Sequence, residues 1–287
     1  MNISSALSQA RQNLDSKGVS NSKLDSLILL THAFFILGIS LSKEQIIFNP
    51  EQELSLEQQQ VFFNLILRRS NREPVSHIIG KREFFGEDFV VSKDVLDPRP
   101  DSESLIEAVF SNFADKDQKL KILELGVGSG CLIITLLRSY KLAFGVGVDV
   151  SEKALVICRK NAANQQVLNR LQLVKSNLFD EVNASEKFDL IISNPPYIPS
   201  QDIEILEPEV RIHEPRLALD GGVDGLDFYR KIAVEAKNFL KQNGQIILEI
   251  GIGQQQEIAD IFAREGFLLL EEKRDLSQVV RVLVISN

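Results

Sequence analysis

The chain has 287 residues, of which 44% are hydrophobic and 25% charged, and its formal net charge is −8. This length suits one large or two modest domains of an ordinary globular protein, and the negative charge disfavours a broad nucleic-acid-binding surface. Two cysteines, Cys131 and Cys158, lack metal-ligand spacing and predict no disulfide framework, as in a reducing compartment. Residues 1–20 carry no signal-peptide core, and the apolar run 27–38 is too short and too polar to cross a bilayer, so we expect a cytoplasmic protein without a membrane partner.

Residues 1–76 have the pattern of a small helical bundle. Apolar residues recur at helical spacing over 24–35 and again over 56–69, and Gly18 and Gly38 stand where helix ends are expected. We therefore expect an N-terminal helical domain without a catalytic constellation.

Residues 77–97 differ in composition from the helical segment before them. Their β-branched and aromatic residues, interrupted by Gly80 and Gly86, predict a short β-hairpin that links two domains. The Asp-Pro-Arg-Pro-Asp segment then ends the strand, and Asp101 or Ser102 is expected to cap the helix that follows.

The remaining domain, residues 98–287, alternates apolar strands with helices. We expect strands at 121–125, 143–149, 170–175, 188–193, 245–250, 267–272 and 279–285, and helices near 130–139, 152–165, 225–241 and 254–265. This alternation predicts an α/β fold with a largely parallel sheet covered by helices on both faces. The short connection between the last two strands predicts that one of them is antiparallel.

A glycine-rich loop follows the first of these strands. Gly126, Gly128 and Gly130 would let the backbone approach a ligand, although a tight strand-to-helix turn can also require glycine. Glu124 precedes the loop, where a carboxylate could meet a positive charge on a ligand. The next strand ends in Asp149, which can accept hydrogen bonds from ribose hydroxyls or cap the following helix. The two features favour a nucleoside cofactor and leave S-adenosylmethionine and NAD open.

The stretch FDLIISNPPYIPS runs a buried strand into Asn194-Pro195-Pro196-Tyr197. The prolines stiffen the chain at the carboxyl end of a strand, where open α/β sheets bind ligands. The Asn194 side-chain oxygen and the Pro195 carbonyl can accept both N–H bonds of an NH2 group and favour a pyramidal, reactive nitrogen over a planar one. Tyr197 can stack on a flat amide or base. The stretch therefore predicts a clamp for methylation of an NH2 group, and an Asn-Pro turn is the structural alternative.

Together these motifs resemble the class I S-adenosylmethionine-dependent methyltransferases, and within them the release-factor glutamine N5-methyltransferase family, HemK/PrmC. The resemblance extends from the interdomain hairpin to near the C-terminus, in segments 72–103, 122–130, 194–197, 213–230 and 247–254.

The resemblance implies a Rossmann-like seven-stranded sheet joined by the hairpin to a helical domain that helps dock a protein substrate. That substrate would be the glutamine in the Gly-Gly-Gln loop of class I peptide-chain release factors. The implied catalytic residues are Asn194, Pro195, Pro196 and Tyr197, which with Arg99 also form the implied substrate-binding set. The implied S-adenosylmethionine-binding residues are Glu124, Gly126, Val127, Gly128, Ser129, Gly130, Asp149, Asn177, Leu178 and Asn194.

The chain departs from the family pattern at three places. Asn177-Leu178 stands near the adenine, where the family usually has Asp and an aromatic residue, and an amide oxygen accepts from the adenine amino group more weakly than a carboxylate. Val127 stands where Thr is frequent, and Asp97 where an apolar residue is usual. These departures affect the expected cofactor affinity more than the reaction type.

Several residues keep two interpretations. The long connection over 197–225 is expected to form one wall of the substrate groove. Within it, Arg211 and His213 could contact substrate or lie on the solvated surface. Arg99 could lie at the active site or form a structural ion pair, and Glu249 could act in the site or anchor a loop.

Three other functions remain to be weighed: methylation of a ribosomal-protein glutamine, methylation of an adenine or guanine amino group in DNA or RNA, and binding without catalysis. The negative charge and the lack of a basic, aromatic stripe disfavour direct nucleic-acid contact. The segment 98–103 favours the release-factor branch, and the intact clamp disfavours a binding-only protein. The three histidines have no partners at metal spacing, so we expect no metal, and we expect a monomer.

Overall fold

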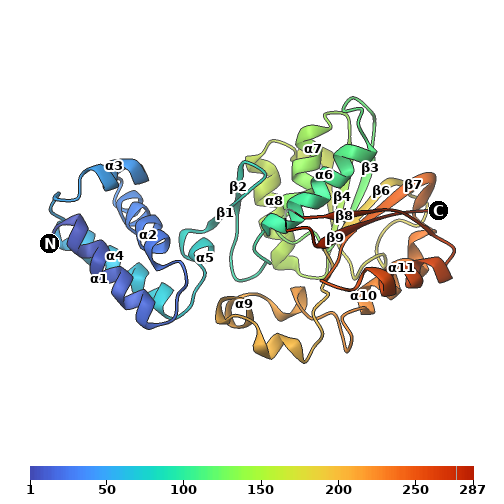
Figure 1. Ribbon diagram of the computed structural model, residues 1–287. Coiled ribbons are helices and arrows are strands. Elements are labelled where there is room, and N and C mark those ends of the chain that lie inside the picture. The colour runs from blue at the N-terminus through green and yellow to red at the C-terminus, as the bar shows by residue number, and fades with distance from the viewer. Residues whose placement is uncertain (276) are drawn as a thin grey trace. The chain divides into compact units, whose positions relative to one another are not determined.

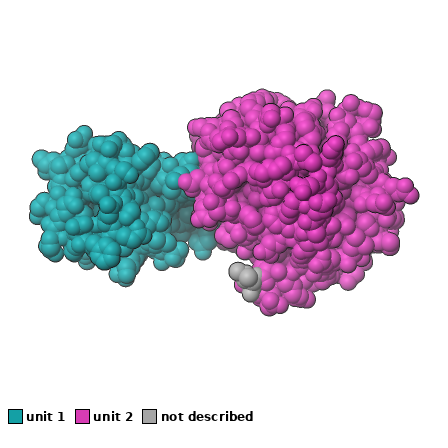
Figure 2. All heavy atoms as spheres, turned by 90° about the horizontal axis from the view of Figure 1, so that it is seen from above, with its two compact units in different colours: residues 1–81, 207–213 teal, residues 82–206, 214–287 magenta. Residues whose placement is uncertain are grey.

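The computed structural model describes residues 1–275 and 277–287. The chain forms two compact units, one made of residues 1–81 and 207–213 and the other of residues 82–206 and 214–287 (Figure 2). Within the described residues, no helix has both the length and the apolar character that a membrane crossing requires.

The first unit is a helical bundle. Its helices are α1 (Ile3–Ser16), α2 (Ser22–Ile36), α3 (Lys43–Phe48), α4 (Leu56–Ser70), α5 (Val75–Ile79) and α9 (Pro208–His213). Ser42 and Ser55 begin α3 and α4 with capping boxes, in which the serine and a glutamine three residues on satisfy each other's free backbone N–H groups. One apolar core, which includes Leu14, Leu30 and Phe62, holds the helices together.

Helix α9 joins this bundle through a cluster of ion pairs. Arg69 Nε lies 2.7 Å from Asp25 Oδ2, and its Nη2 lies 2.9 Å from Glu209 Oε1. Arg72 Nη2 lies 2.6 Å from Glu209 Oε2. Only 7% of the Arg69 side chain is exposed, so its buried charge depends on these two carboxylates, and loss of either would weaken its compensation.

The second unit is built on a seven-stranded sheet. A separate two-stranded sheet is formed by β1 (Lys81–Phe84), whose first residue belongs to the first unit, and β2 (Glu87–Val90). The large sheet has the order β5-β4-β3-β6-β7-β9-β8. Its strands are β3 (Lys121–Leu125), β4 (Phe144–Asp149), β5 (Leu171–Lys175), β6 (Phe188–Ser193), β7 (Leu240–Glu249), β8 (Leu268–Arg274) and β9 (Val280–Ser286). The strands β3 to β7 run parallel, and β9 is antiparallel to both of its neighbours. The expected Rossmann-like α/β fold is confirmed.

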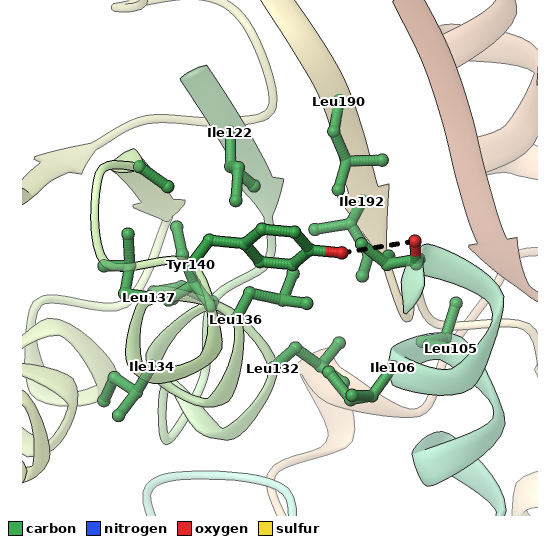
Figure 3. Close-up of a cluster of buried hydrophobic side chains, with 14 of the residues drawn as sticks. Leu105, Ile106, Ile122, Leu132, Ile134, Leu136, Leu137, Tyr140, Leu190 and Ile192 are labelled. Atoms are coloured by element: carbon green, nitrogen blue, oxygen red, sulfur yellow. Dashed lines mark hydrogen bonds between the residues drawn. The ribbon is translucent and has the colours of Figure 1, made fainter. Parts of the chain in front are cut away.

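Helices cover both faces of this sheet (Figure 1). They are α6 (Glu103–Asn112), α7 (Cys131–Ser139) and α8 (Glu152–Asn164) on one face, and α10 (Asp227–Ala236) and α11 (Gln255–Arg264) on the other. Side chains of one strand alternate between the two cores: Ile122 packs with the first group and Leu123 with the second. Figure 3 shows the first core, in which Tyr140 at the end of α7 lies among Ile122 and Ile192 of the sheet.

Some expected boundaries were wrong. Residues 78 and 79, expected in the hairpin, end the short helix α5. The expected helix over 225–241 ends at Ala236, and β7 begins at Leu240 rather than at 245. The reason is packing: Phe239 stacks on Phe179 with ring centroids 4.7 Å apart, which places its neighbour Leu240 beside β6.

The arrangement of the sheet positions the site. Because β3, β4, β6 and β7 are parallel, their carboxyl ends meet at one edge. The glycine loop, Asp149, Asn194 and Glu249 lie at these strand ends.

Candidate functional site

A cavity of about 240 Å³ opens at this edge of the sheet. The expected site residues that line it are Arg99, Glu124, Gly126, Val127, Gly128, Ser129, Asp149, Asn177, Leu178, Asn194 and Pro196. Gly130, Pro195 and Tyr197 lie outside its lining. The structure thus brings most of the expected residues together, and their individual roles stay predictions.

The three glycines of the loop after β3 differ in what they face. A Cβ at Gly126 or Gly128 would meet no atom within 4 Å, although their φ angles of +73° and +53° favour glycine. A Cβ at Gly130 would come within 2.5 Å of Cys158 Sγ. Packing therefore explains Gly130, whereas the first two glycines leave room in the cavity for a ligand to approach the backbone.

Two acidic side chains organise this loop. Glu124 Oε2 accepts from the Ile133 main-chain N–H at 3.0 Å, which satisfies a free donor of the first turn of α7. Asp149 accepts from the N–H groups of Gly128 and Ser151, each at 2.9 Å. The cap of α8 itself is the Ser151 side chain, so Asp149 connects the glycine loop to the start of α8.

Burial disfavours the charge on both acids. It raises the pKa of Glu124 well above its ordinary value, with a further contribution from Asp149. It also raises the pKa of Asp149, against the lowering effect of the backbone N–H groups that Asp149 accepts. Two carboxyl groups at one cavity suit a ligand that carries hydroxyl donors or positive charge, because either would offset their desolvation.

The expected adenine contact has an unusual backbone. Leu178 is buried, lines the cavity and has a φ of +53°, which is rare for a residue other than glycine. The Ser176 hydroxyl donates to the Leu178 carbonyl at 2.9 Å and stabilises this turn. Asn177 is exposed at the cavity rim, and its Nδ2 donates to Asp180 at 3.3 Å. Strained conformations of this kind, worth about 1–3 kcal/mol, cluster at ligand sites.

The Asn194 side chain is held by Ser102, which the sequence suggested as a helix cap. Its Nδ2 donates to Ser102 Oγ at 3.0 Å. The expectation that Ser102 or Asp101 caps α6 is wrong: Ser102 occupies the cap position but makes no capping hydrogen bond with its side chain. Its hydroxyl donates to Glu249 Oε2 at 2.5 Å instead, and the Asp101 carboxylate accepts from Arg281.

Glu249 joins this group from the end of β7. Its Oε1 lies 3.4 Å from the Tyr197 hydroxyl, and its main-chain carbonyl accepts from Tyr229 at 2.8 Å. Burial raises the pKa of Glu249 to about 7. Tyr197 is also held through its own carbonyl, which accepts from Gln254 at 3.1 Å.

The long connection after Tyr197 divides between the two units. Pro215, Leu217 and Ala218 line the cavity, and the wall of a substrate groove that was expected from this connection stays a prediction. Residues 207–213 belong to the helical bundle, so the whole connection does not form one wall. Arg211 and His213 do not line the cavity; Arg211 is exposed, and a ring nitrogen of His213 lies 3.3 Å from the Asn71 carbonyl.

Arg99 combines its two interpretations. It lines the cavity, and its Nη2 lies 2.6 Å from Glu214 Oε2, so it forms an ion pair at the site. The Glu214 side chain is only 2% exposed. This ion pair holds the segment that leads to Pro215 in the cavity wall.

Comparison with known proteins places these features in a family. Residues 5–80 match the model of the PrmC N-terminal domain, and residues 82–210 match that of the methyltransferase small domain. The chain is 39% identical over 279 residues to a release factor glutamine methyltransferase of Caulobacter vibrioides, covering 97% of this chain and 94% of the relative. It is 38% identical over 284 residues to one of Agrobacterium fabrum, covering 98% and 96%.

A solved methyltransferase from Pyrococcus furiosus shares the fold. It has a TM-score of 0.52 and 18% identity, covering 81% of this chain and 98% of the other. At this identity the likeness concerns the fold alone.

Proposed function

Because the chain belongs to the release factor glutamine methyltransferase family, we propose that it methylates a glutamine side-chain amide of peptide-chain release factors. The acceptor is N5 of the glutamine in the Gly-Gly-Gln motif of class I factors. The observation that carries the proposal is Asn194, which lies at the carboxyl end of β6, lines the cavity and is held by Ser102.

The cavity fits S-adenosylmethionine as the methyl donor. When bound, S-adenosylmethionine supplies a methyl group on a positively charged sulfur, which keeps the electron pair of the carbon–sulfur bond as the methyl group leaves. Gly126 and Gly128 leave open space beside the backbone, and Asp149 keeps lone pairs for ribose hydroxyls beyond the two N–H groups that it already accepts. Leu178 and Asn177 would contact the adenine.

The acceptor amide is held by the clamp. The Asn194 side-chain oxygen and the Pro195 carbonyl accept hydrogen bonds from the two N–H groups of the glutamine amide, which favours the pyramidal nitrogen of the transition state. The nitrogen loses one of these protons to water once it carries the methyl group. Tyr197 lies outside the cavity lining, so we propose that it supports the clamp through Glu249 as well as by contact with the amide. Holding both reactants in place can lower the barrier by about 7–11 kcal/mol without a strong base.

Residues 1–76 form the proposed docking domain for the release factor, residues 77–97 the linker, and residues 98–287 the methyltransferase domain. Docking of a folded partner would select one glutamine among the many that an amide clamp alone could accept.

Methyl transfer from labelled S-adenosylmethionine tests the proposal. The acceptors are a purified release factor, the same factor with its Gly-Gly-Gln glutamine changed to alanine, a ribosomal protein pool, and DNA and RNA. We expect label on the intact factor alone, and its loss with Asn194→Ala. Label on the ribosomal pool or on nucleic acid, with none on the factor, would refute the proposed substrate while keeping the reaction type.

A further inference from the structure

A chain of three polar side chains lies behind the cavity. Asn194 Nδ2 donates to Ser102 Oγ at 3.0 Å, and Ser102 Oγ donates to Glu249 Oε2 at 2.5 Å. Ser102 is 3% exposed and Glu249 1%. In sequence, Ser102 is 92 residues from Asn194 and 147 residues from Glu249, and only the fold brings the three together.

The Glu249 carboxylate determines which group donates in each of these two hydrogen bonds. An ionised carboxylate accepts hydrogen bonds and donates none, so Ser102 must give its single hydroxyl proton to Glu249. Ser102 Oγ can then only accept from its other neighbour, which requires the Nδ2 end of the Asn194 amide. In a planar amide the oxygen points away from that partner. Ionised Glu249 thereby selects one of the two orientations of the Asn194 side chain.

We propose that Ser102 and Glu249 are positioning residues for methyl transfer: ionised Glu249, acting through Ser102, holds Asn194 with its oxygen toward the acceptor amide and places a negative charge behind it. The inference rests on the proposed function, in which Asn194 accepts a hydrogen bond from the glutamine amide. With the amide reversed, an NH2 group would face the NH2 group of the substrate.

The buried charge also acts on the rate. Methyl transfer would move positive charge from the cofactor sulfur to the acceptor nitrogen, so a fixed negative charge behind Asn194, on the side of the nitrogen, stabilises the transition state more than the ground state. Hydrogen bonds in a chain also polarise one another, which makes the Asn194 oxygen a stronger acceptor. Both effects change kcat rather than the binding of the release factor, which would depend on the wider docking surface.

The groups around Glu249 determine when it is ionised. Among the described residues, the charged and titratable groups that affect the pKa of Glu249 are Asp101, Tyr197 and Arg281. Cys131 and Tyr229 also face it, and its carboxylate raises their pKa values. Burial is the largest influence and raises the pKa of Glu249 to about 7, Asp101 raises it further, and Ser102, Arg281 and Tyr197 lower it. Because the ionised form is the active one, kcat should be high above pH 7 and fall as the pH drops through that value.

The test measures kcat and KM for the release factor at saturating cofactor, from pH 5.5 to 8.5, in wild type, Glu249→Gln, Ser102→Ala and the double variant. We expect Glu249→Gln to lower kcat at pH 8 by about tenfold or more with little change in KM, and to remove the acidic limb of the kcat profile. Ser102→Ala should lower kcat in the same way. Since both act through one chain, the double variant should be no worse than the more impaired single variant.

Tyr229→Phe is the matched control, because it removes a hydrogen bond to the main-chain carbonyl of Glu249 and leaves the carboxylate in place. Its kcat should stay within about twofold of wild type. Thermal melting and S-adenosylhomocysteine affinity, measured for every variant, separate a folding or cofactor defect from a positioning defect.

The possible outcomes distinguish a failure of the positioning roles from a failure of the proposed function. Wild-type transfer combined with unchanged kcat and an unchanged acidic limb in Glu249→Gln would overturn this inference alone. Losses that multiply in the double variant would also overturn it, because they would indicate independent roles. Absence of transfer by the wild type would overturn the proposed function and this inference with it.

Discussion

Replacement of Asp149 by asparagine tests the cofactor half of the site. The Asp149 carboxylate accepts two backbone N–H groups, from Gly128 and Ser151, each at 2.9 Å. An amide has one acceptor oxygen, so Asp149→Asn turns an NH2 group toward one of these donors or toward the ribose hydroxyls. A lost hydrogen bond to a charged group is worth about 1.5–3 kcal/mol, and a loss near 2 kcal/mol corresponds to about 30-fold weaker binding.

Isothermal titration calorimetry with S-adenosylhomocysteine measures the effect. The matched control is Glu152→Gln, which removes the same charge from an exposed position three residues further on. We expect about 30-fold weaker binding for Asp149→Asn and affinity near that of wild type for the control. Equal affinities of Asp149→Asn and wild type would refute the assignment of Asp149 to the ribose.

Three further predictions follow from the same geometry. Gly128→Ala should abolish cofactor binding, because the added Cβ enters cavity space that the cofactor would occupy. The protein should still fold, because that Cβ meets no atom within 4 Å and the φ of +53° costs only about 1–2 kcal/mol. Calorimetry and a thermal melt check the two effects, and tight cofactor binding would contradict the first. Desolvation raises the pKa of Cys131, which is half-buried and lines the cavity, to about 12. Its labelling by a thiol reagent at pH 8 should therefore be far slower than that of an unperturbed thiol, and rapid labelling would contradict the raised pKa. The pKa of Glu249 is raised from 4.5 to about 7, so its ionisation destabilises the folded state above pH 7 and this penalty is relieved as the pH falls toward 4.5. Glu249→Gln should therefore be more stable than wild type at pH 8, by up to about 3 kcal/mol, and by less than about 1 kcal/mol at pH 5. Thermal melts at the two pH values check this, and an equal gain at both would contradict it.

The fold could be read from the sequence because its central strands are buried on both faces. Strands such as Phe188–Ser193 form nearly continuous apolar runs, and the intervening helices show helical periodicity. The predicted ends of helices and strands were wrong where the local sequence pattern conflicts with tertiary packing. Residues 237–241 continue a helical pattern, but Phe239 packs against Phe179 and starts a strand at Leu240 instead.

The candidate site was predictable where its residues lie in one short segment. The glycine loop and Asn194 follow apolar strands, and the carboxyl ends of parallel strands meet at one edge. The connection of Asn194 to Ser102 and Glu249 could not be predicted, because it depends on side chains from three distant elements. Glu249 had two open interpretations, and Ser102 was expected to be a helix cap.

The helical bundle shows a second limit of sequence reasoning. Segment 207–213 stands between two stretches of the methyltransferase unit, and its position gives no sign that it belongs with residues 1–81. The reason is the buried Arg69, whose charge is matched by both Asp25 and Glu209. Such pairing over 140 positions has no local signature.

The position of the methyl group on the release factor tests the proposed function most directly. A release factor incubated with the enzyme and S-adenosylmethionine is digested and analysed by tandem mass spectrometry, beside the same reaction with Asn194→Ala. We predict one added methyl group on the side-chain amide of the Gly-Gly-Gln glutamine with the wild type, and none with the variant. A methyl group on another residue, or equal methylation by Asn194→Ala, would contradict it.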